Sequence, residues 1–153
     1  MQTVLGHHLI GAPRNKIMML HKYKAHKRFE ANIIDTLPLN SSYLDIGSNF
    51  GDTVLTLAKY AQRINRSDIR FFAFEPNKIK CDYIKKINDL NNLNIKVIES
   101  CVGDVNGYSQ VNSDRDELSG AVSYKTIIKE EEAIQNNDVV FRTIKLDDME
   151  KEL

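Results

Sequence analysis

A strand that runs directly into a glycine-containing turn and then a helix is the feature that most constrains the fold of this chain. It lies between Tyr43 and Asp52, where the sequence reads YLDIGSNFGD. Apolar and polar side chains alternate up to Ile46, as expected for the end of a strand. Gly47 and Gly51 can take positive φ, so the backbone there can turn sharply and come close to a ligand.

A helix is predicted from Thr53 onward, because apolar residues then recur with helical spacing on one face. Its apolar positions are Val54, Leu57, Ala58, Ala61 and Ile64. A strand, a glycine turn and a helix N-terminus together form a pocket suited to a nucleotide-like ligand.

A second apolar strand, residues 71–74, ends at the sequence Glu75-Pro76-Asn77. If the two strands are parallel neighbours, Glu75 lies at the carboxyl end of the sheet, where a carboxylate can accept hydrogen bonds from both hydroxyls of a ribose. The glycines form G-x-x-x-G, which is neither the dinucleotide fingerprint nor a P-loop. The combination predicts a pocket for a nucleoside cofactor, and the alternative is an ordinary α/β turn.

The next segments continue the alternation of strands and helices. A helix is predicted from Pro76-Asn77, since proline suits the first helical turn, and a third strand from Ile95 to Val102. The apolar face expected for this helix consists of Ile79, Tyr83, Ile87 and Leu90. The order strand, helix, strand, helix, strand is half of a doubly wound, mainly parallel α/β sheet. Right-handed crossovers would place both helices on one face of it.

The flanking segments are less regular. After Asp104, Asn106-Gly107 predicts a turn, followed by short strands within residues 108–111, 121–128 and 139–144 and a short helix or loop at 130–137. Before the core we expect a loose or docked arm over residues 1–13, a helix capped by Asn15, and a helix from about Phe29 that ends at Pro38. We therefore expect a helical leader over residues 1–40 and a core domain over residues 41–153.

Charge and cysteine content exclude several classes of protein. Lys and Arg total 21 and Asp and Glu total 21, so the balanced chain is not expected to bind nucleic acid. No acid precedes Glu30; this basic leader is either a solvated face or a patch for phosphate or a membrane surface.

Cys81 and Cys101 are too few for a zinc knuckle or a disulfide framework, so we expect reduced thiols and no metal site. Without an apolar run near membrane length or a secretion signal, we expect no membrane span and a cytoplasmic location.

Several segments resemble FkbM-type methyltransferases, which depend on S-adenosyl-L-methionine and have the Rossmann-like class I methyltransferase fold. They are DIGSNFG from Asp45, AFEPN from Ala73, CVGD from Cys101 with Gly107 soon after, and TIKLDDM from Thr143 to Met149. The resemblance runs from about Tyr43 to Met149. It implies a transferase that binds S-adenosyl-L-methionine and methylates oxygen, typically a hydroxyl of a sugar or another small molecule.

The resemblance also implies roles for individual residues. Backbone N–H groups of Ser48, Asn49 and Gly51 would meet the carboxylate of the methionine end, Asp45 would take its ammonium group, and Glu75 would hold the ribose. The alternatives are that Asp45 caps its own turn and that Glu75 is surface charge before a proline.

Adenine would lie farther along the chain, between Cys101 and Val102, with Asp104 accepting a hydrogen bond from its exocyclic amine. Packing for Cys101 and a plain turn role for Asp104 are the alternatives. All four histidines lie before Glu30, and the resemblance gives no reason to choose one as a catalytic base. The full set of residues expected to bind the cofactor is Asp45, Gly47, Ser48, Asn49, Gly51, Glu75, Cys101, Val102 and Asp104.

The family pattern continues with a Lys-Ile-Asp-x-Glu-Gly strand after the Leu-Asp-Asp segment, whereas this sequence ends at Leu153. We therefore expect the later core strands, with the catalytic and acceptor-binding residues, to be missing. An open sheet edge would then need cover, from a homo-oligomer or a separate partner chain. The alternative function is a truncated, catalytically inactive cofactor-binding or protein-interaction module. A nucleotide-sugar or dinucleotide oxidoreductase is disfavoured by the glycine spacing.

Overall fold

The computed structural model describes residues 2–4, 7–9, 27–111, 124–127 and 140–150. Its elements in chain order are β1 (Gln2–Val4), β2 (His7–Leu9), α2 (Lys27–Thr36), β3 (Ser42–Ile46), α3 (Asp52–Arg63), β4 (Arg70–Phe74), α4 (Lys78–Leu90), β5 (Ile95–Ile98), β6 (Cys101–Gly103), β7 (Gly107–Val111), β8 (Tyr124–Ile127), β9 (Val140–Lys145) and the short 3₁₀ helix η1 (Leu146–Met149). The fold is mixed α/β. The helix expected near Asn15 and the segment 130–137 lie outside the described residues.

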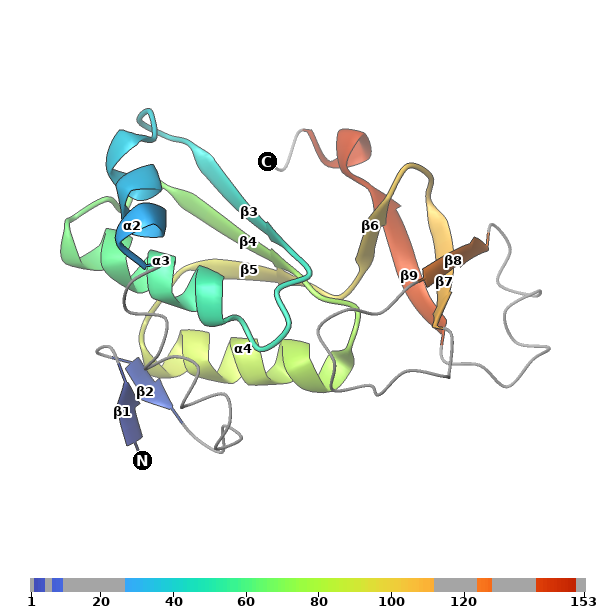
Figure 1. Ribbon diagram of the computed structural model, residues 1–153, viewed down its shortest axis with the longest axis horizontal. Helices are drawn as coiled ribbons and strands as arrows, with labels where there is room; N and C mark the ends of the chain where they lie inside the picture. Colours follow the sequence, from blue (N-terminus) through green and yellow to red (C-terminus); the bar gives the residue numbers. More distant parts are fainter. Residues whose placement is uncertain (1, 5–6, 10–26, 112–123, 128–139, 151–153) are drawn as a thin grey trace.

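A parallel three-stranded sheet forms the centre of the fold, in the order β3-β4-β5. Tyr43 pairs with Phe71, and Phe71 pairs with Ile95, so the three strands are in matched register. The helices α3 and α4 run along one side of this sheet (Figure 1). This arrangement is the βαβαβ unit that the sequence predicts.

The main core lies between this sheet and the helices. Its buried residues are Ile34, Val54, Leu55, Leu57, Ala58, Ala61, Ile69, Phe71, Ala73, Ile84, Ile87 and Ile95. In α3 the predicted apolar face is buried at Val54, Leu57, Ala58 and Ala61, whereas Ile64 at its end is exposed. Both helices therefore pack on one face, as the crossover rule requires.

The predicted apolar face of α4 is wrong at its start. Ile79 is 77% exposed, and the residues that α4 buries are Cys81, Ile84 and Ile87. Because each helical residue advances about 100°, Ile79 lies nearly opposite Cys81. The start of the helix is close to the prediction: Asn77 caps it by accepting a hydrogen bond from the Lys80 N–H at 3.3 Å.

The predicted third strand is interrupted. β5 ends at Ile98, and the Ser100 N–H turns back to the Ile98 carbonyl oxygen at 3.0 Å. The chain then enters a different, four-stranded sheet with the order β6-β9-β7-β8. The interruption was not predictable from local pattern, because β6 takes its partner from distant β9, where Cys101 pairs with Thr143.

The second sheet lies beyond the carboxyl ends of the three parallel strands (Figure 1). It packs against the face of the parallel sheet that carries no helix, through a small apolar cluster. The buried residues of this cluster are Phe72, Phe74 and Ile144, and Leu44, Ile98, Val102, Leu146 and Met149 pack against them. β6 also comes very close to β9, because a Cβ on Gly103 would lie 2.8 Å from Thr143 Cγ2.

The leader is not entirely helical. β1 and β2 form an antiparallel pair, and the predicted second helix is present as α2. The boundary between residues 1–40 and 41–153 stays a prediction. Among the described residues, no helix has both the length and the apolar character needed to span a membrane.

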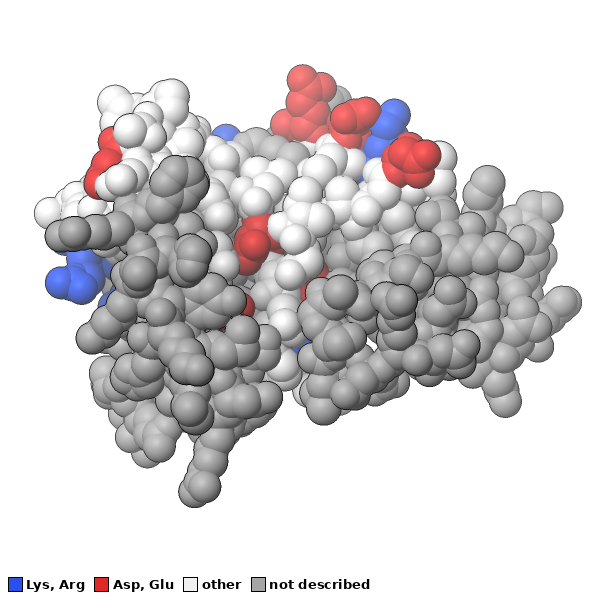
Figure 2. Space-filling view, viewed as in Figure 1, with Lys and Arg blue, Asp and Glu red and all other residues white. Residues whose placement is uncertain are grey.

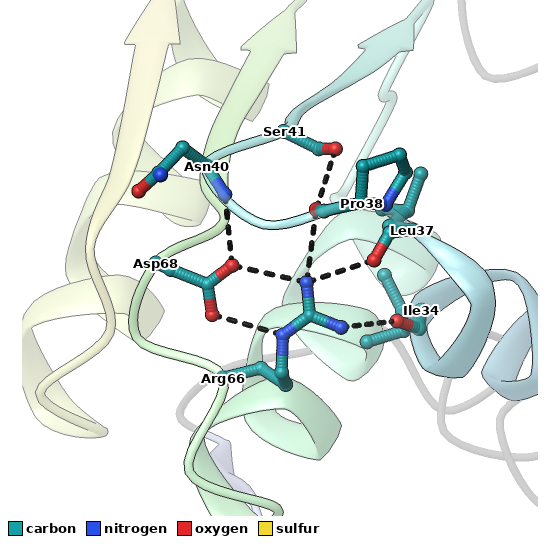
Figure 3. Close-up of polar contacts among 7 residues, drawn as sticks. All are labelled: Ile34, Leu37, Pro38, Asn40, Ser41, Arg66 and Asp68. Carbon is teal, nitrogen blue, oxygen red and sulfur yellow. Dashed lines mark hydrogen bonds and ion pairs between the residues drawn. The ribbon is translucent and has the colours of Figure 1, made fainter.

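Arg66 ties the end of α2 to the core (Figure 3). Its guanidinium pairs with Asp68 at 2.9 Å, and Asp68 Oδ2 accepts a hydrogen bond from the Asn40 N–H at 3.0 Å. The same guanidinium donates to three carbonyl oxygens at the end of the helix, those of Ile34 (3.2 Å), Leu37 (3.0 Å) and Pro38 (3.1 Å). Carbonyl groups at a helix C-terminus lack intrahelical partners, so Arg66 both caps α2 and fixes the entry to β3.

Candidate functional site

The glycine turn after β3 is held against the end of β4. The N–H groups of Gly47 and Ser48 both donate to the Phe74 carbonyl oxygen, at 2.9 and 3.0 Å. Ser48 Oγ donates to the Asp45 carbonyl oxygen at 2.7 Å. Gly47 and Gly51 have φ of 76° and 75°, and Asn49 between them has φ of 53°. The positive φ values predicted for the glycines are confirmed, with a third at Asn49.

The two glycines have different surroundings. A Cβ on Gly47 would meet nothing within 4 Å, so the backbone there borders open space. A Cβ on Gly51 would lie 2.9 Å from Ile84 Cγ1 and 3.0 Å from Leu55 Cδ1. Gly51 is therefore required for the packing of α3 against α4. Both glycines were expected to let the backbone come close to a ligand. The structure leaves room for a ligand beside Gly47, whereas side chains already fill the space beside Gly51.

Glu75 lies at the carboxyl end of β4 with its carboxylate turned toward the glycine turn. It is 5% exposed, and its two oxygens accept hydrogen bonds from different backbone groups. Oε2 accepts from the Asn49 N–H at 2.8 Å, and Oε1 accepts from the Asn77 N–H at 3.0 Å. Glu75 thus joins the turn after β3 to the start of α4, and the surface-charge alternative is inconsistent with its burial.

The three N–H groups expected to meet the carboxylate of the methionine end have acceptors within the protein, so that role stays a prediction. Those of Ser48, Asn49 and Gly51 already donate within the protein, to the Phe74 carbonyl, Glu75 Oε2 and the Ser48 carbonyl. These hydrogen bonds close the turn on itself, with positive φ at Gly47, Asn49 and Gly51. The start of α3 is the remaining source of donors: its N-cap Gly51 has no side chain, and the first N–H groups of a helix lack intrahelical acceptors.

Two buried side-chain oxygens near Glu75 have no hydrogen-bond partner among the described residues. They are Asn49 Oδ1, in the glycine turn, and Ser100 Oγ, in the connection from β5 to β6. Buried polar atoms are nearly always satisfied in folded proteins. These two acceptors are therefore available to donors from a ligand, and neither the Ser100 hydroxyl nor the orientation of Asn49 was evident from the sequence.

Cys101, Val102 and Asp104 lie on and just after β6. Burial raises the pKa of the Cys101 thiol to about 11, and hydrogen bonding with Ser109 lowers it while the charge of Glu75 raises it further. Val102 packs in the second apolar cluster. Asp104 is exposed in the turn before β7. The structure thus brings Cys101 into the electrostatic range of Glu75, whereas Val102 and Asp104 have surroundings that a structural role explains.

Further residues support Glu75 without having been predicted. Cys81 Sγ donates to the Glu75 carbonyl oxygen at 2.9 Å, and burial raises the pKa of this thiol to about 12. Phe50 packs edge-on against Tyr83, with ring centroids 5.5 Å apart, and links the turn to α4. The sequence feature that could have identified Phe50 as part of the site is its position between the two glycines. For Cys81, the corresponding feature is its spacing of three residues from Ile84, which places both on one face of the helix.

Two cavities that are lined by described residues lie away from the glycine turn. The larger, of about 610 Å³, lies between β5 and the second sheet, and a smaller one of about 180 Å³ lies beside the end of α3. Within the described part of the chain, no group of three His, Cys, Asp or Glu side chains is arranged to hold a metal ion.

Comparison with known proteins finds one weak structural similarity. No family model matches the chain, and no curated protein matches it. Among solved structures, it is similar to a Plasmodium falciparum protein described as a protein-L-isoaspartate O-methyltransferase (beta-aspartate methyltransferase), in complex with S-adenosyl-L-homocysteine. The identity is 13%, the TM-score is 0.36, and the match covers 87% of this chain and 71% of that chain. At this TM-score, the fold and chemistry of the present chain have to be inferred from its own residues.

Proposed function

We propose that this chain binds S-adenosyl-L-methionine at the carboxyl ends of β3 and β4 and serves in methyl transfer to a hydroxyl of a sugar or another small molecule, as an FkbM-type enzyme. The observation that carries the proposal is the position of Glu75. A buried carboxylate at the tip of β4 faces a glycine turn at the tip of β3, which is where a doubly wound sheet holds the ribose of a nucleoside cofactor.

The residues present fit the cofactor. A carboxylate has about four acceptor positions, and backbone N–H groups use one on each oxygen of Glu75. Two ribose hydroxyls can therefore still donate to it. Open space beside Gly47 gives a ligand access to the backbone, and Asn49 Oδ1 and Ser100 Oγ offer two further acceptors. Asp45, partly buried at the end of β3, supplies a negative charge for the ammonium group.

S-adenosyl-L-methionine supplies an electrophilic methyl group on a sulfonium ion. The contribution of this chain is to bind and orient it. The backbone bonds that fix the Glu75 carboxylate preorganise the ribose site, and precise placement accounts for much of the rate of a displacement reaction. An alcohol acceptor also loses a proton to a base. We assign that base to no residue of the described part of the chain.

Isothermal titration calorimetry with S-adenosylhomocysteine tests the proposal. The wild type should bind saturably with one site, and Glu75→Gln should bind at least about tenfold more weakly, because it loses the charge that strengthens two hydrogen bonds. Glu75→Gln keeps one acceptor oxygen but places its NH₂ group against the other backbone N–H, so a thermal midpoint and circular dichroism spectrum like those of the wild type must accompany the affinity measurement. Asp82→Asn, an exposed carboxylate on α4, is the matched control and should bind like the wild type.

Absence of binding by the wild type at about 1 mM ligand, or equal affinity in Glu75→Gln, would rule out the proposed site, since millimolar affinity is already only about 4 kcal/mol. Transfer of a labelled methyl group to sugar acceptors then separates the two functional alternatives. Turnover indicates the enzyme, whereas binding without turnover on any acceptor indicates a cofactor-binding module.

A further inference from the structure

The groove between the two sheets is built from side chains of both. β5 contributes Lys96 and Ile98 from the face of the parallel sheet opposite the helices, and β9 contributes Arg142 and Ile144. Residues two apart on a strand point to the same face. The groove of about 610 Å³ falls within the usual range of small-molecule sites, about 300–1,000 Å³. It is therefore large enough for a metabolite.

Positive charge is concentrated in this groove. Lys96, Arg142 and Lys145 line it, against a single lining carboxylate, Asp148. Lys145 Nζ is paired with Asp147 Oδ2 at 3.2 Å, so Lys96 and Arg142 carry the positive charge that faces the groove. Asp148 is hydrogen-bonded to the Asn106 side chain. Arg142 forms no ion pair with any residue that the structure describes. Within the described part of the chain no carboxylate therefore competes for its guanidinium, and Arg is well suited to pairing with an anion.

The walls and rim restrict which anion fits. Apolar and aromatic side chains, including Ile98, Tyr108 and Met149, line the groove between the cations. Asn106 fixes one rim, because its Oδ1 accepts a hydrogen bond from the Lys145 N–H at 2.8 Å. The adjoining η1 segment carries the acids Asp147 and Asp148, and charged side chains gather at the top of Figure 2, slightly right of centre. Asp147 is paired with Lys145 and Asp148 lines the groove itself, so this rim offers no free positive charge to an extended polyanion and the groove suits a small anion.

We propose that this groove is a binding site for a small anionic molecule with an apolar body, such as an aryl or alkyl phosphate. Arg142 and Lys96 bind the anionic group, and Ile98, Tyr108 and Met149 contact the apolar body. The site is separate from the glycine turn and does not depend on the proposed cofactor. Both charge and apolar surface contribute, so the ligand needs both.

Titration of the ¹⁵N-labelled chain with phenyl phosphate, followed by NMR, tests this inference. Amide signals of residues 106–108 and 142–145 should shift saturably. Phenol and inorganic phosphate, each carrying half of the ligand, should bind at least about tenfold more weakly. Arg142→Gln and Lys96→Gln should each weaken phenyl phosphate binding about tenfold, as expected for the loss of one hydrogen bond to a charged group.

Arg63→Gln is the matched control, because Arg63 is an exposed cation on α3 outside the groove. Unchanged thermal midpoints would show that the variants are folded. The inference is overturned by non-saturating shifts, by phenol binding as tightly as phenyl phosphate, by equal affinity in Arg142→Gln, or by shifts confined to Gly47–Asn49. None of these outcomes decides whether S-adenosylhomocysteine binds, because that is measured with a different ligand, so the two proposals succeed or fail separately.

Discussion

The parallel sheet and the second sheet are built by different means. Among the described residues, twelve buried apolar side chains join the helices to the parallel sheet, whereas three join the second sheet to it. The second sheet instead buries polar groups, with Ser109 Oγ and Thr143 Oγ1 2.5 Å apart. Apolar burial stabilises at about 25 cal/mol per Å², whereas a hydrogen bond contributes about 1 kcal/mol net.

The difference shows where the fold is anchored. The parallel sheet, with α3 and α4, supplies the stable framework, and the candidate cofactor site lies at its carboxyl edge. The second sheet is attached through a few contacts, and the anionic groove lies at that junction. Ligand sites commonly occur where two packed units meet.

Truncation of one core isoleucine in each region should give the largest effects and the clearest contrast. Ile84→Ala, at 0% exposure in the main core, should lower the free energy of unfolding by about 4 kcal/mol. Ile144→Ala, at 7% exposure in the small cluster, should cost about 2 kcal/mol. Urea unfolding measures both. Equal losses would refute the claim that the two regions differ in packing.

Alanine at the two glycines of the turn separates strain from packing. Gly47→Ala has only the left-handed backbone to accommodate and should cost about 1 kcal/mol. Gly51→Ala has the same φ and also meets Ile84 and Leu55, so it should cost about 3 kcal/mol. The comparison uses unfolding free energies. A Gly51→Ala variant no less stable than Gly47→Ala would show that α3 and α4 do not pack as described.

Close packing inside the second sheet can be tested by rescue. Gly103→Ala would place a Cβ 2.8 Å from Thr143 Cγ2, which should cost about 2 kcal/mol. Thr143→Ser removes that methyl group and keeps the hydroxyl for Ser109. In the Thr143→Ser background the cost of Gly103→Ala should fall below about 1 kcal/mol, a coupling that a double-mutant cycle measures. Additive losses would mean that the two strands are farther apart.

The smallest effect concerns pH and the attachment of α2. The Arg66 guanidinium holds the pKa of Asp68 at about 2, below the ordinary value of an aspartate. A lowered native pKa contributes stability that is complete above the unfolded-state pKa near 4 and is lost as pH falls toward 2. Wild-type stability should therefore decline more between pH 5 and pH 2 than that of Asp68→Asn. Asp82→Asn, which removes an exposed partner of Lys78, is the control, and its stability should depend on pH as that of the wild type does. If the stability of Asp68→Asn showed the same pH dependence as the wild type, the account would be contradicted.

The parallel sheet was largely predictable, and the short strands predicted within residues 108–111, 121–128 and 139–144 are confirmed as β7, β8 and β9. The way in which the second sheet pairs was not predictable. Strand and helix periodicity indicated β3, α3, β4 and β5 because their pairing follows chain order. The break after Ile98 depends on the long-range pairing of Cys101 with Thr143, which local pattern does not encode. At the site, the position of Glu75 beside the glycine turn was predictable, because the order strand, glycine turn, helix, strand places both at the carboxyl ends of neighbouring parallel strands. The engagement of the Ser48 and Asn49 N–H groups was not, because it depends on backbone angles that the sequence alone does not specify.

The account rests on the carboxylate of Glu75 as the anchor of a nucleoside. The most direct measurement is a crystal structure of the chain grown with S-adenosylhomocysteine. We predict both ribose hydroxyls within hydrogen-bond distance of the Glu75 oxygens, with the ligand passing beside Gly47. A ligand bound in another place, or a Glu75 side chain that points away from the ribose, would contradict the account.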